Sequence, residues 1–342
     1  MITAVRDRFT GTNWEFRIVD RWHPKSQSQA TDSQNPEPDT KRLEPKMPTY
    51  RARPATSYSQ PLPEMPVGSV SISDREFHLL RTLVHEKFGI NLTQEKRALL
   101  VGRLGRLLRT GGFRNFEAYY DYLLADSTGS ALDSLVNRIS TNYTFFYRES
   151  EHFDFFSSVV LPELDGRMKR ENYRDLRLWC AGCSSGQEPY TLAMLLLEYF
   201  GEEYGRWKAG LLATDISAKA LETATRGIYP EEALDRLPPL LKRRYFRRVG
   251  QEEYEVKKEV KNEITFRRFN LMNDRFPFRR PFHVIFCRNV MIYFDQPTRD
   301  SLIRRFYESM VPEAYLFIGH SETLGRKQSF FEYVRPALYR RR

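Results

Sequence analysis

Residues 176–190 have the sequence Leu-Arg-Leu-Trp-Cys-Ala-Gly-Cys-Ser-Ser-Gly-Gln-Glu-Pro-Tyr. The apolar start predicts a short strand, the small residues predict a loop, and Pro189 fits the first turn of a following helix. Small residues let backbone N–H groups approach a ligand closely, so the loop either binds a ligand or packs tightly against a neighbouring element. The spacing is not that of a dinucleotide-binding glycine motif, and the absence of Gly-Lys-Ser/Thr excludes a P-loop.

The chain beyond this loop alternates between short apolar strands and helices. We expect strands at 176–179, 210–213, 264–266, 284–287 and 315–319. We expect helices between several of these strands, at 188–200, 218–226 and 296–310. Alternation of this kind predicts an α/β fold with a doubly wound, mostly parallel sheet. Two shorter strands, near 245–249 and 254–260, predict a hairpin inserted into this sheet domain.

The chain before the sheet domain is organised differently. Residues 1–68 hold nine of the 19 prolines, mixed with Ser, Gln and Thr, which predicts a disordered extension. The sequence Ser-Asp-Arg-Glu at 73–76 has the form of a capping box, so a helix is expected to begin there and to stop at Gly89. Three more helices are expected at 93–110, 116–124 and 130–139. The predicted domains are therefore the extension at 1–68, an all-helical domain at 69–140 and a sheet domain at 141–342, with a β-subdomain inserted at about 243–262.

Composition excludes several classes of protein. The 342 residues include 54 Lys and Arg against 44 Asp and Glu, and the net charge of +10 predicts an acidic partner: nucleic acid, acidic protein or anionic lipid. The longest strictly apolar run has six residues, whereas a membrane-spanning helix needs about 20. Three cysteines cannot form a disulfide framework, and the first residues lack the apolar segment of a secretory signal. We therefore expect a cytoplasmic protein.

Single polar residues in the sheet domain allow more than one interpretation. Asp215 ends the second strand, where adenosine-binding sheets place the acceptor for ribose hydroxyls, or it caps the next helix. Cys180 and Cys183 form a Cys-x-x-Cys pair, but a structural zinc needs four ligands and Cys287 has no paired Cys or His, so we interpret them as small residues in the turn. His320 is either a general base or a hydrogen-bonded structural residue.

Two segments combine aromatic residues with an arginine. Residues 142–149 have the sequence Asn-Tyr-Thr-Phe-Phe-Tyr-Arg-Glu, and residues 286–294 have the sequence Phe-Cys-Arg-Asn-Val-Met-Ile-Tyr-Phe. One interpretation is apolar packing between the two modules. The other is a pocket in which Arg148 offers a planar guanidinium to a carboxylate and the rings face a cationic ligand.

Five motifs follow one another along the chain. They are Asn-x-Thr-x-Phe-x-Arg-Glu at 142–149, Gly-x-x-x-Gly-x-Glu-Pro-Tyr at 182–190, Ala-Thr-Asp-Ile at 213–216, Phe-Cys-Arg-Asn-Val-x-Ile-Tyr-Phe at 286–294 and Gly-His-Ser-Glu at 319–322. In this order they resemble the CheR-type chemotaxis receptor glutamate methyltransferases. The resemblance covers about residues 70 to 338, and only the N-terminal extension lies outside it.

The resemblance implies a class I SAM-dependent methyltransferase, with a Rossmann-like, mostly parallel sheet, a small all-α N-terminal domain and an inserted antiparallel β-subdomain. It implies S-adenosyl-L-methionine as the cofactor, S-adenosyl-L-homocysteine as the product and no metal. The family transfers the methyl group to the side-chain carboxylate of specific glutamates on the cytoplasmic helical bundle of transmembrane chemoreceptors, which gives glutamate methyl esters and serves chemotaxis adaptation.

The resemblance also assigns residues to the cofactor and to the reaction. The residues that match the cofactor-binding positions are Asn142, Thr144, Arg148, Gly182, Glu188, Asp215, Asn270, Leu271, Arg288 and Asn289. Asp215 would hold the ribose. Arg148 and Tyr293 would lie beside the transferred methyl group and act in catalysis.

The second predicted helix carries a row of arginines that could meet an acidic receptor helix. These residues are Arg97, Arg103, Arg106 and Arg109. Docking of the substrate is one interpretation, and an ordinary solvated helix face is the other. The segment between Phe246 and Val256 is shorter and less rich in glycine than in relatives that bind a receptor's C-terminal pentapeptide, which argues against tethering through the β-subdomain.

Two other functions compete with receptor methylation. One is a class I methyltransferase acting on RNA, which the charge of +10 would suit. No RNA-binding signature occurs in the sequence, so we expect no nucleic acid partner. The other is a catalytically idle, SAM-binding regulator, against which the intact Arg148, Asp215 and Tyr293 argue. We expect a monomer that does not insert into a membrane.

Overall fold

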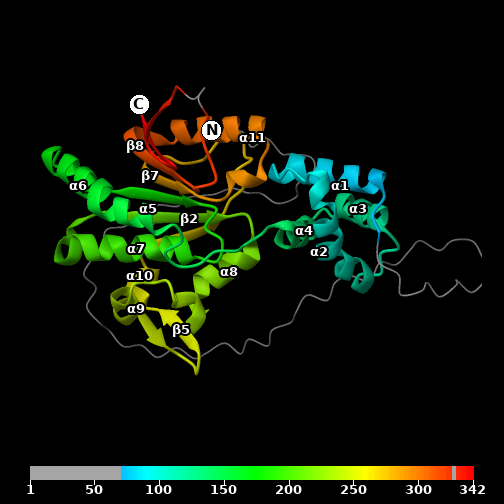
Figure 1. Cartoon of the computed structure of the whole chain (residues 1–342), viewed down its shortest axis with the longest axis horizontal. Coiled ribbons are helices and arrows are strands. Elements are labelled where there is room, and N and C mark those ends of the chain that lie inside the picture. Colours follow the sequence, from blue (N-terminus) through cyan, green and yellow to red (C-terminus); the bar gives the residue numbers. More distant parts are fainter. Residues whose placement is uncertain (1–70, 326–328) are drawn as a thin grey trace, which may run out of the picture. The chain divides into compact units, whose positions relative to one another are not determined.

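The computed structural model describes residues 71–325 and 329–342, which form two compact units (Figure 1). The smaller unit comprises residues 71–80 and 94–131, and the larger comprises residues 81–93 and 132–342. The predicted extension at 1–68 lies outside the described residues, so its disorder stays a prediction. No helix in the described part of the chain combines the length and the apolar character that crossing a bilayer requires.

The smaller unit is helical, as the sequence predicts. Its elements are the first half of α1 (Asp74–Phe88), η1 (Gln94–Lys96), α2 (Arg97–Thr110), α3 (Phe116–Ala125) and the start of α4 (Ser130–Ile139). The capping box at the start of α1 is confirmed, because Ser73 N donates to Glu76 Oε2 at 2.8 Å and Glu76 N donates to Ser73 Oγ at 3.3 Å. Glu76 Oε1 also accepts from Glu117 N at 3.1 Å, which fixes α3 to α1.

A seven-stranded sheet forms the centre of the larger unit. Its strands are, in spatial order, β6 (Ile264–Arg268), β2 (Gly210–Asp215), β1 (Arg177–Ala181), β7 (Phe282–Cys287), β8 (Met310–Ile318), β10 (Leu338–Arg341) and β9 (Phe331–Arg335). The first five run parallel, and β10 is antiparallel to both of its neighbours. The order of the strands reverses between β1 and β7, so the carboxyl ends of these two strands mark the place where doubly wound sheets bind their ligands.

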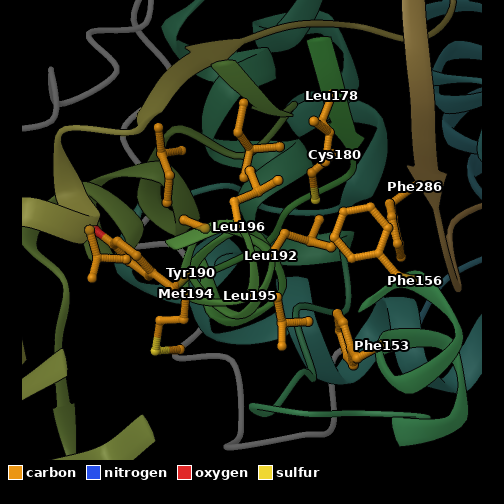
Figure 2. Close-up of a cluster of buried hydrophobic side chains, with 14 of the residues drawn as sticks. Phe153, Phe156, Leu178, Cys180, Tyr190, Leu192, Met194, Leu195, Leu196 and Phe286 are labelled. Carbon is orange, nitrogen blue, oxygen red and sulfur yellow. The ribbon is translucent and has the colours of Figure 1, made fainter. Parts of the chain in front are cut away.

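Helices cover this sheet and supply most of the core. They include α5 (Ser150–Phe155), the π-helical turn η2 (Phe156–Val160), α6 (Leu161–Arg170), α7 (Gln187–Phe200), α8 (Ala218–Arg226) and α11 (Gln296–Glu308). Figure 2 shows side chains of α7 between those of β1 and those of α5 and η2. The β1 strand is buried along all five of its residues, as expected for a central strand of a parallel sheet.

A small antiparallel sheet is inserted between α8 and β6. Its spatial order is β3 (Ile228–Pro230), β5 (Glu253–Val256) and β4 (Phe246–Arg248), and α9 (Pro239–Tyr245) and α10 (Lys258–Lys261) flank it (Figure 1). The predicted hairpin is therefore confirmed as β4 and β5. The prediction missed β3 and extended the second strand to residue 260, where the chain instead forms α10.

Candidate active site

A cavity of about 250 Å³ opens where β6, β2, β1 and β7 end, within the larger unit. All the cofactor and catalytic residues assigned from the resemblance line it: Asn142, Thr144, Arg148, Gly182, Glu188, Asp215, Asn270, Leu271, Arg288, Asn289 and Tyr293. The parallel sheet brings together the loops after β1, β2, β6 and β7, and the segment before α5 joins them through hydrogen bonds from Ser184 Oγ to Asn142 O at 3.1 Å and from Tyr293 Oη to Thr141 O at 3.4 Å. The lining also includes Phe88 and Ile90, which sequence reasoning assigned to a helix end and not to a site.

The loop between β1 and α7 is packed tightly at both of its glycines. Gly182 N donates to Thr214 O at 2.8 Å, which joins the loop to the end of β2. A Cβ atom on Gly182, where φ is +90°, would lie 2.4 Å from Val290 Cγ2, and one on Gly186, where φ is +98°, would lie 2.9 Å from Ala224 Cβ. Neither position accepts a side chain without displacing its neighbour. The loop therefore packs tightly against its neighbours and also lines the cavity.

Asp215 is held by backbone N–H groups at the end of β2. Its Oδ2 accepts from Ser184 N at 2.7 Å and its Oδ1 accepts from Ser217 N at 2.9 Å. Burial raises the pKa of Asp215, and these hydrogen bonds act in the opposite direction. The helix cap is a different residue, because Ser217 Oγ accepts from Ala220 N at 3.1 Å at the start of α8. The interpretation of Asp215 as a helix cap is therefore wrong. Its place in the cavity lining fits the interpretation as an acceptor for ribose hydroxyls.

A buried arginine lies between two carboxylates at the inner wall of the cavity. Arg288 Nε lies 3.2 Å from Glu188 Oε2 and 3.6 Å from Glu149 Oε2, and the Arg288 side chain is 1% exposed. Burial raises the pKa of Glu188, and the Arg288 guanidinium opposes that rise. Among the described residues, Arg288 Nη1 has no hydrogen-bond acceptor although it is buried. A buried donor without an acceptor is costly, so this N–H group suits a ligand with an acceptor, such as a carboxylate.

The two candidate catalytic side chains lie at the part of the cavity formed by residues 141–148. Arg148 Nη1 donates to Tyr143 O at 3.0 Å, and its Cζ lies 5.9 Å from the centroid of the Phe145 ring. Tyr293 Oη donates to Thr141 O at 3.4 Å. Both side chains are half-buried, so each can meet a ligand that enters the cavity.

The cysteines behave as buried small residues. Cys180 Sγ donates to Glu188 Oε1 at 3.0 Å. Burial and then the Glu188 carboxylate raise the pKa of the Cys180 thiol well above its usual range, and burial does the same for Cys183 and Cys287. Since the thiolate is the form that binds metals and attacks disulfides, the structure favours the small-residue interpretation of the Cys-x-x-Cys pair.

Glu149, His152 and His320 form a cluster with the donor types of a metal site, with ligand atoms within 4.8 Å of one another. Glu149 already accepts from Asn289 Nδ2 at 3.1 Å and from His320 N at 3.3 Å. Burial, and after it Arg288 and His320, lower the pKa of His152 to about 3. A cation placed here would face the Arg288 guanidinium, so we assign no metal to this cluster. His320 is not among the residues that line the cavity, which favours its structural interpretation.

The four arginines of α2 lie in the smaller unit and differ in their surroundings. Arg97 pairs with Asp74, donates to Ile72 O and lies over the Phe77 ring, so it serves the unit's own structure. Arg103 is half-buried, whereas Arg106 and Arg109 are exposed. The latter two are the residues of this helix best placed to meet a partner.

Comparison with known proteins identifies the family. The family model for the CheR methyltransferase SAM binding domain matches residues 142–339, and the model for the CheR methyltransferase all-alpha domain matches residues 75–140. The chain belongs to the CheR methyltransferase family. It is similar to the chemotaxis protein methyltransferase of Borreliella burgdorferi, with 42% identity over 273 residues that cover 80% of this chain and 96% of that protein.

Other CheR methyltransferases are similar to the chain over a comparable length. The chemotaxis protein methyltransferase of Escherichia coli is 37% identical over 265 residues, which cover 77% of this chain and 89% of that protein. Among solved structures, a SAM-dependent methyltransferase from Methanosarcina mazei has 20% identity and a TM-score of 0.25, covering 42% of this chain and 52% of that chain. The resemblance inferred from the five motifs and the class I fold expected from it are both confirmed.

The CheR methyltransferase cavity fits the cofactor that its family model names. Residues 142–339 form a SAM-binding methyltransferase domain. The cofactor carries a carboxylate, an ammonium and two ribose hydroxyls, and the lining offers the unpaired Arg288 Nη1, the buried Glu188 carboxylate and Asp215. This CheR methyltransferase is therefore a SAM-dependent enzyme of the chemotaxis type.

Proposed function

We propose that this CheR methyltransferase transfers the methyl group of S-adenosylmethionine to the side-chain carboxylate of specific glutamates on the cytoplasmic helices of chemoreceptors. The products are glutamate methyl esters and S-adenosylhomocysteine. The match of both family domains to the chain carries this proposal, together with the names of the relatives, which are chemotaxis protein methyltransferases. The gathering of the assigned cofactor and catalytic residues around one cavity supports it.

The cavity residues divide between the parts of the cofactor. We place the ribose hydroxyls on Asp215 and the cofactor carboxylate on the unpaired Nη1 of Arg288, with Glu188 near the ammonium. Asn142 and Thr144 line the methionine end. Asn270, Leu271 and Asn289 border the adenine and the catalytic face. When bound, the cofactor supplies an electrophilic methyl group on a sulfonium ion.

The reaction needs alignment more than proton transfer. A glutamate has a pKa of about 4.3, so the substrate carboxylate is ionised at neutral pH and needs no general base. It must lose water and lie in line with the sulfur–methyl bond. Arg148 can orient the carboxylate with its guanidinium, and Tyr293 can hold it with its hydroxyl. Weak binding of the substrate carboxylate by these two side chains serves catalysis better, because tight binding of the ground state would not raise the rate.

The receptor is proposed to dock on α2 of the smaller unit. Arg106 and Arg109 are exposed there and would face the acidic surface of a receptor helix bundle, with Arg103 beside them. Attraction between opposite charges speeds the encounter, and added salt weakens that attraction by screening the charges. We propose that the protein acts as a monomer in the cytoplasm, without a nucleic acid partner, without insertion into the membrane and without a metal. We do not propose that the C-terminal pentapeptide of a receptor binds the β-subdomain.

Transfer of radiolabelled methyl from S-adenosylmethionine to receptor-containing membranes tests the function. Label that alkali releases as volatile methanol identifies a carboxyl methyl ester, and this is the expected result. Parallel reactions with total RNA and with membranes lacking receptors serve as controls. Transfer to RNA with none to receptors would overturn the proposal, and cofactor binding without any transfer would identify an idle regulator.

A further inference from the structure

The carboxylate of Glu322 joins two loops beside the cavity. Glu322 ends the Gly-His-Ser-Glu motif after β8 and is 8% exposed. Its Oε2 accepts from Asn289 N at 2.9 Å and from Gly319 N at 2.5 Å, and its Oε1 accepts from Ile292 N at 3.1 Å. One side chain thus holds backbone N–H groups of the loop after β7 and of the loop after β8.

The loop after β7 carries several cavity residues. Arg288, Asn289 and Tyr293 all line the cavity. Asn289 has a φ of 58°, in the left-handed region that few residues other than glycine and asparagine adopt readily, and its N–H group is one of those that Glu322 holds. The hydrogen bond to Ile292 N fixes the backbone directly before Tyr293. Glu322 therefore stabilises an unusual backbone conformation at the place where two candidate functional side chains leave the chain.

The influence of Glu322 extends to the segment that carries Arg148. Asn289 Nδ2 donates to Glu149 Oε1 at 3.1 Å, and Arg288 Nη2 donates to the carbonyl oxygen of Arg148. The contacts of the loop after β7 thus continue to the carbonyl oxygen of Arg148 and to the side chain of Glu149. A displacement of this loop would move Arg148 and Tyr293 together.

The approach of the two loops leaves no spare room. A Cβ atom on Gly319 would lie 2.4 Å from Asn289 Nδ2 and 2.9 Å from Glu322 Oε2. A side chain at position 319 would therefore push the loops apart. The close contact at Gly319 and the hydrogen bonds of Glu322 are two separate features, and both set the distance between the loop after β7 and the loop after β8.

We propose that Glu322 is a positioning residue for methyl transfer, which fixes the loop of Asn289 and Tyr293 in the geometry that in-line attack requires. It acts through its hydrogen bonds to the backbone and does not touch the substrate. The inference rests on the proposed function, because it concerns the geometry of the same reaction.

Glu322→Gln tests this role with almost no change in shape. The amide lacks the charge and turns an N–H₂ group toward backbone donors, so at least one of the hydrogen bonds is lost. We expect kcat at saturating cofactor and receptor to fall about 10- to 100-fold, the effect of a displacement of about 1 Å, with the KM of the receptor within about threefold of wild type and a rise in the KM of the cofactor smaller than the fall in kcat, because Arg288 and Asn289 lie on the same loop. Glu322→Asp keeps the charge on a shorter side chain and should recover part of kcat.

Glu76→Gln is the matched control in the smaller unit. Glu76 is a carboxylate with 9% exposure that also accepts from backbone N–H groups, of Ser73 and Glu117. Both variants should lower the melting temperature, because each weakens a buried hydrogen-bonded carboxylate. Only Glu322→Gln should lower kcat per folded molecule.

Gly319→Ala opens the same contact from the other side and should reproduce the loss of kcat while Glu322 is intact.

A pH profile adds a readout that a merely structural role would not move. Burial raises the pKa of Glu322, against the hydrogen bonds of Gly319, Asn289 and Ile292, so the acidic limb of wild-type kcat should lie at higher pH than that of Glu322→Gln.

Two outcomes would overturn the inference, and they differ from a failure of the proposed function. If wild-type enzyme methylates receptors and Glu322→Gln retains kcat within about twofold, the positioning role is wrong. The same holds if kcat falls equally in Glu76→Gln. If the wild-type enzyme itself methylates no receptor glutamate, the proposed function is wrong and the inference falls with it.

Discussion

Arg148 occupies a short segment of unusual backbone. Its neighbours Tyr147 and Glu149 have φ angles of 60° and 57°, values that residues with side chains rarely adopt. The Tyr147 ring packs 5.2 Å from that of Phe153, and Glu149 accepts a hydrogen bond from Asn289, so the surrounding structure holds this conformation. Positive φ also occurs outside the cavity, at Asn172, Glu313 and Ala337, but strained residues cluster at functional sites, and Tyr147 and Glu149 flank a residue that lines the cavity.

We predict that Arg148→Ala nearly abolishes methyl transfer and leaves cofactor binding measurable. The guanidinium would orient the substrate carboxylate, and its loss should lower kcat/KM for the receptor at least about 100-fold, or about 2.7 kcal/mol of transition-state stabilisation. Radiolabelled transfer measures the rate, and titration calorimetry measures the dissociation constant of S-adenosylmethionine.

Arg148→Lys is the control, because it keeps the charge and loses the planar fork. Its rate should lie between those of the wild type and the alanine variant. Turnover of Arg148→Ala close to the wild-type value would contradict the catalytic role.

Among the elements, the junction of β1 and α7 depends on glycine in a way that α2 does not. Gly186 has a φ of +98° and no room for a Cβ atom, since Ala224 Cβ and Tyr229 Oη would both lie at 2.9 Å. Gly102 lies inside α2 and is exposed, and a Cβ atom added there would have no heavy atom of the described residues within 4 Å beyond its own helix backbone. The same substitution should therefore have opposite effects at the two positions.

We predict that Gly186→Ala destabilises the protein by about 2 kcal/mol or more, from strain at positive φ and overlap with α8. Gly102→Ala should stabilise the smaller unit by about 0.5 to 1 kcal/mol, because alanine is the better helix former. Urea unfolding of both variants measures the change. Equal effects of the two substitutions would show that the packing at Gly186 is not limiting.

The exposed arginines of α2 allow a test of docking at the level of one helix face. Reversing both charges, with Arg106→Glu and Arg109→Glu, should raise the KM for receptor-containing membranes several-fold at low salt and leave kcat unchanged. The effect should shrink as salt is added, because screening weakens the attraction that was removed. Initial rates at varied receptor and salt concentrations provide the measurement.

The control for the double substitution in α2 reverses two positive charges at another place on the protein. Arg174→Glu with Lys208→Glu reverses two exposed cations at the amino end of β1 and β2 in the larger unit. If this variant raises KM as much as the α2 variant does, the effect comes from net charge and α2 is not the docking element.

Sequence pattern predicted the elements that are periodic or apolar and missed those that are short or polar. The five expected strands and the capping box of α1 are present because burial and local hydrogen bonds determine them. The β3 strand has only three residues and includes Pro230, and β9 exposes three of its five residues, so neither has a recognisable pattern. Each strand forms because a neighbouring strand offers it hydrogen bonds: β5, well separated in the sequence, pairs with β3, and β10, directly after a short turn, pairs with β9.

At the scale of the whole molecule, the predicted motif residues that follow strands meet because parallel strands end at one edge of the sheet, whereas residues 142–149 precede α5 and follow no strand. That much follows from the alternating pattern, since a doubly wound sheet collects the loops after its strands. The partners of those residues do not follow from it. The position of Arg288 between Glu188 and Glu149, and the bonds from Glu322 to the loop after β7, depend on which loops face each other at distances of a few ångströms.

The pH dependence of stability also depends on the whole fold. His283 in β7 is 4% exposed, and its Nδ1 accepts from Arg177 N at 3.1 Å. Burial, and after it Arg177, Arg167 and Arg280, lower the pKa of His283 to about 3. In the unfolded chain its pKa is about 6.5. Between these two values the unfolded chain binds a proton that the folded protein does not, so the free energy of unfolding decreases as the pH falls.

We predict that His283→Gln removes this contribution. The glutamine keeps a hydrogen-bond acceptor and does not titrate. The free energy of unfolding of the wild type should fall, relative to that of the variant, by up to about 1.4 kcal/mol for each pH unit below 6.5, and the difference should be constant above that pH. His152 acts in the same direction, and the buried carboxyls of Glu188 and Asp215 act in the opposite one, but both proteins contain them. Urea unfolding at several pH values from 7.5 to 4.5 gives the two curves, and curves that stay parallel below pH 6.5 would show that His283 is not a buried neutral histidine.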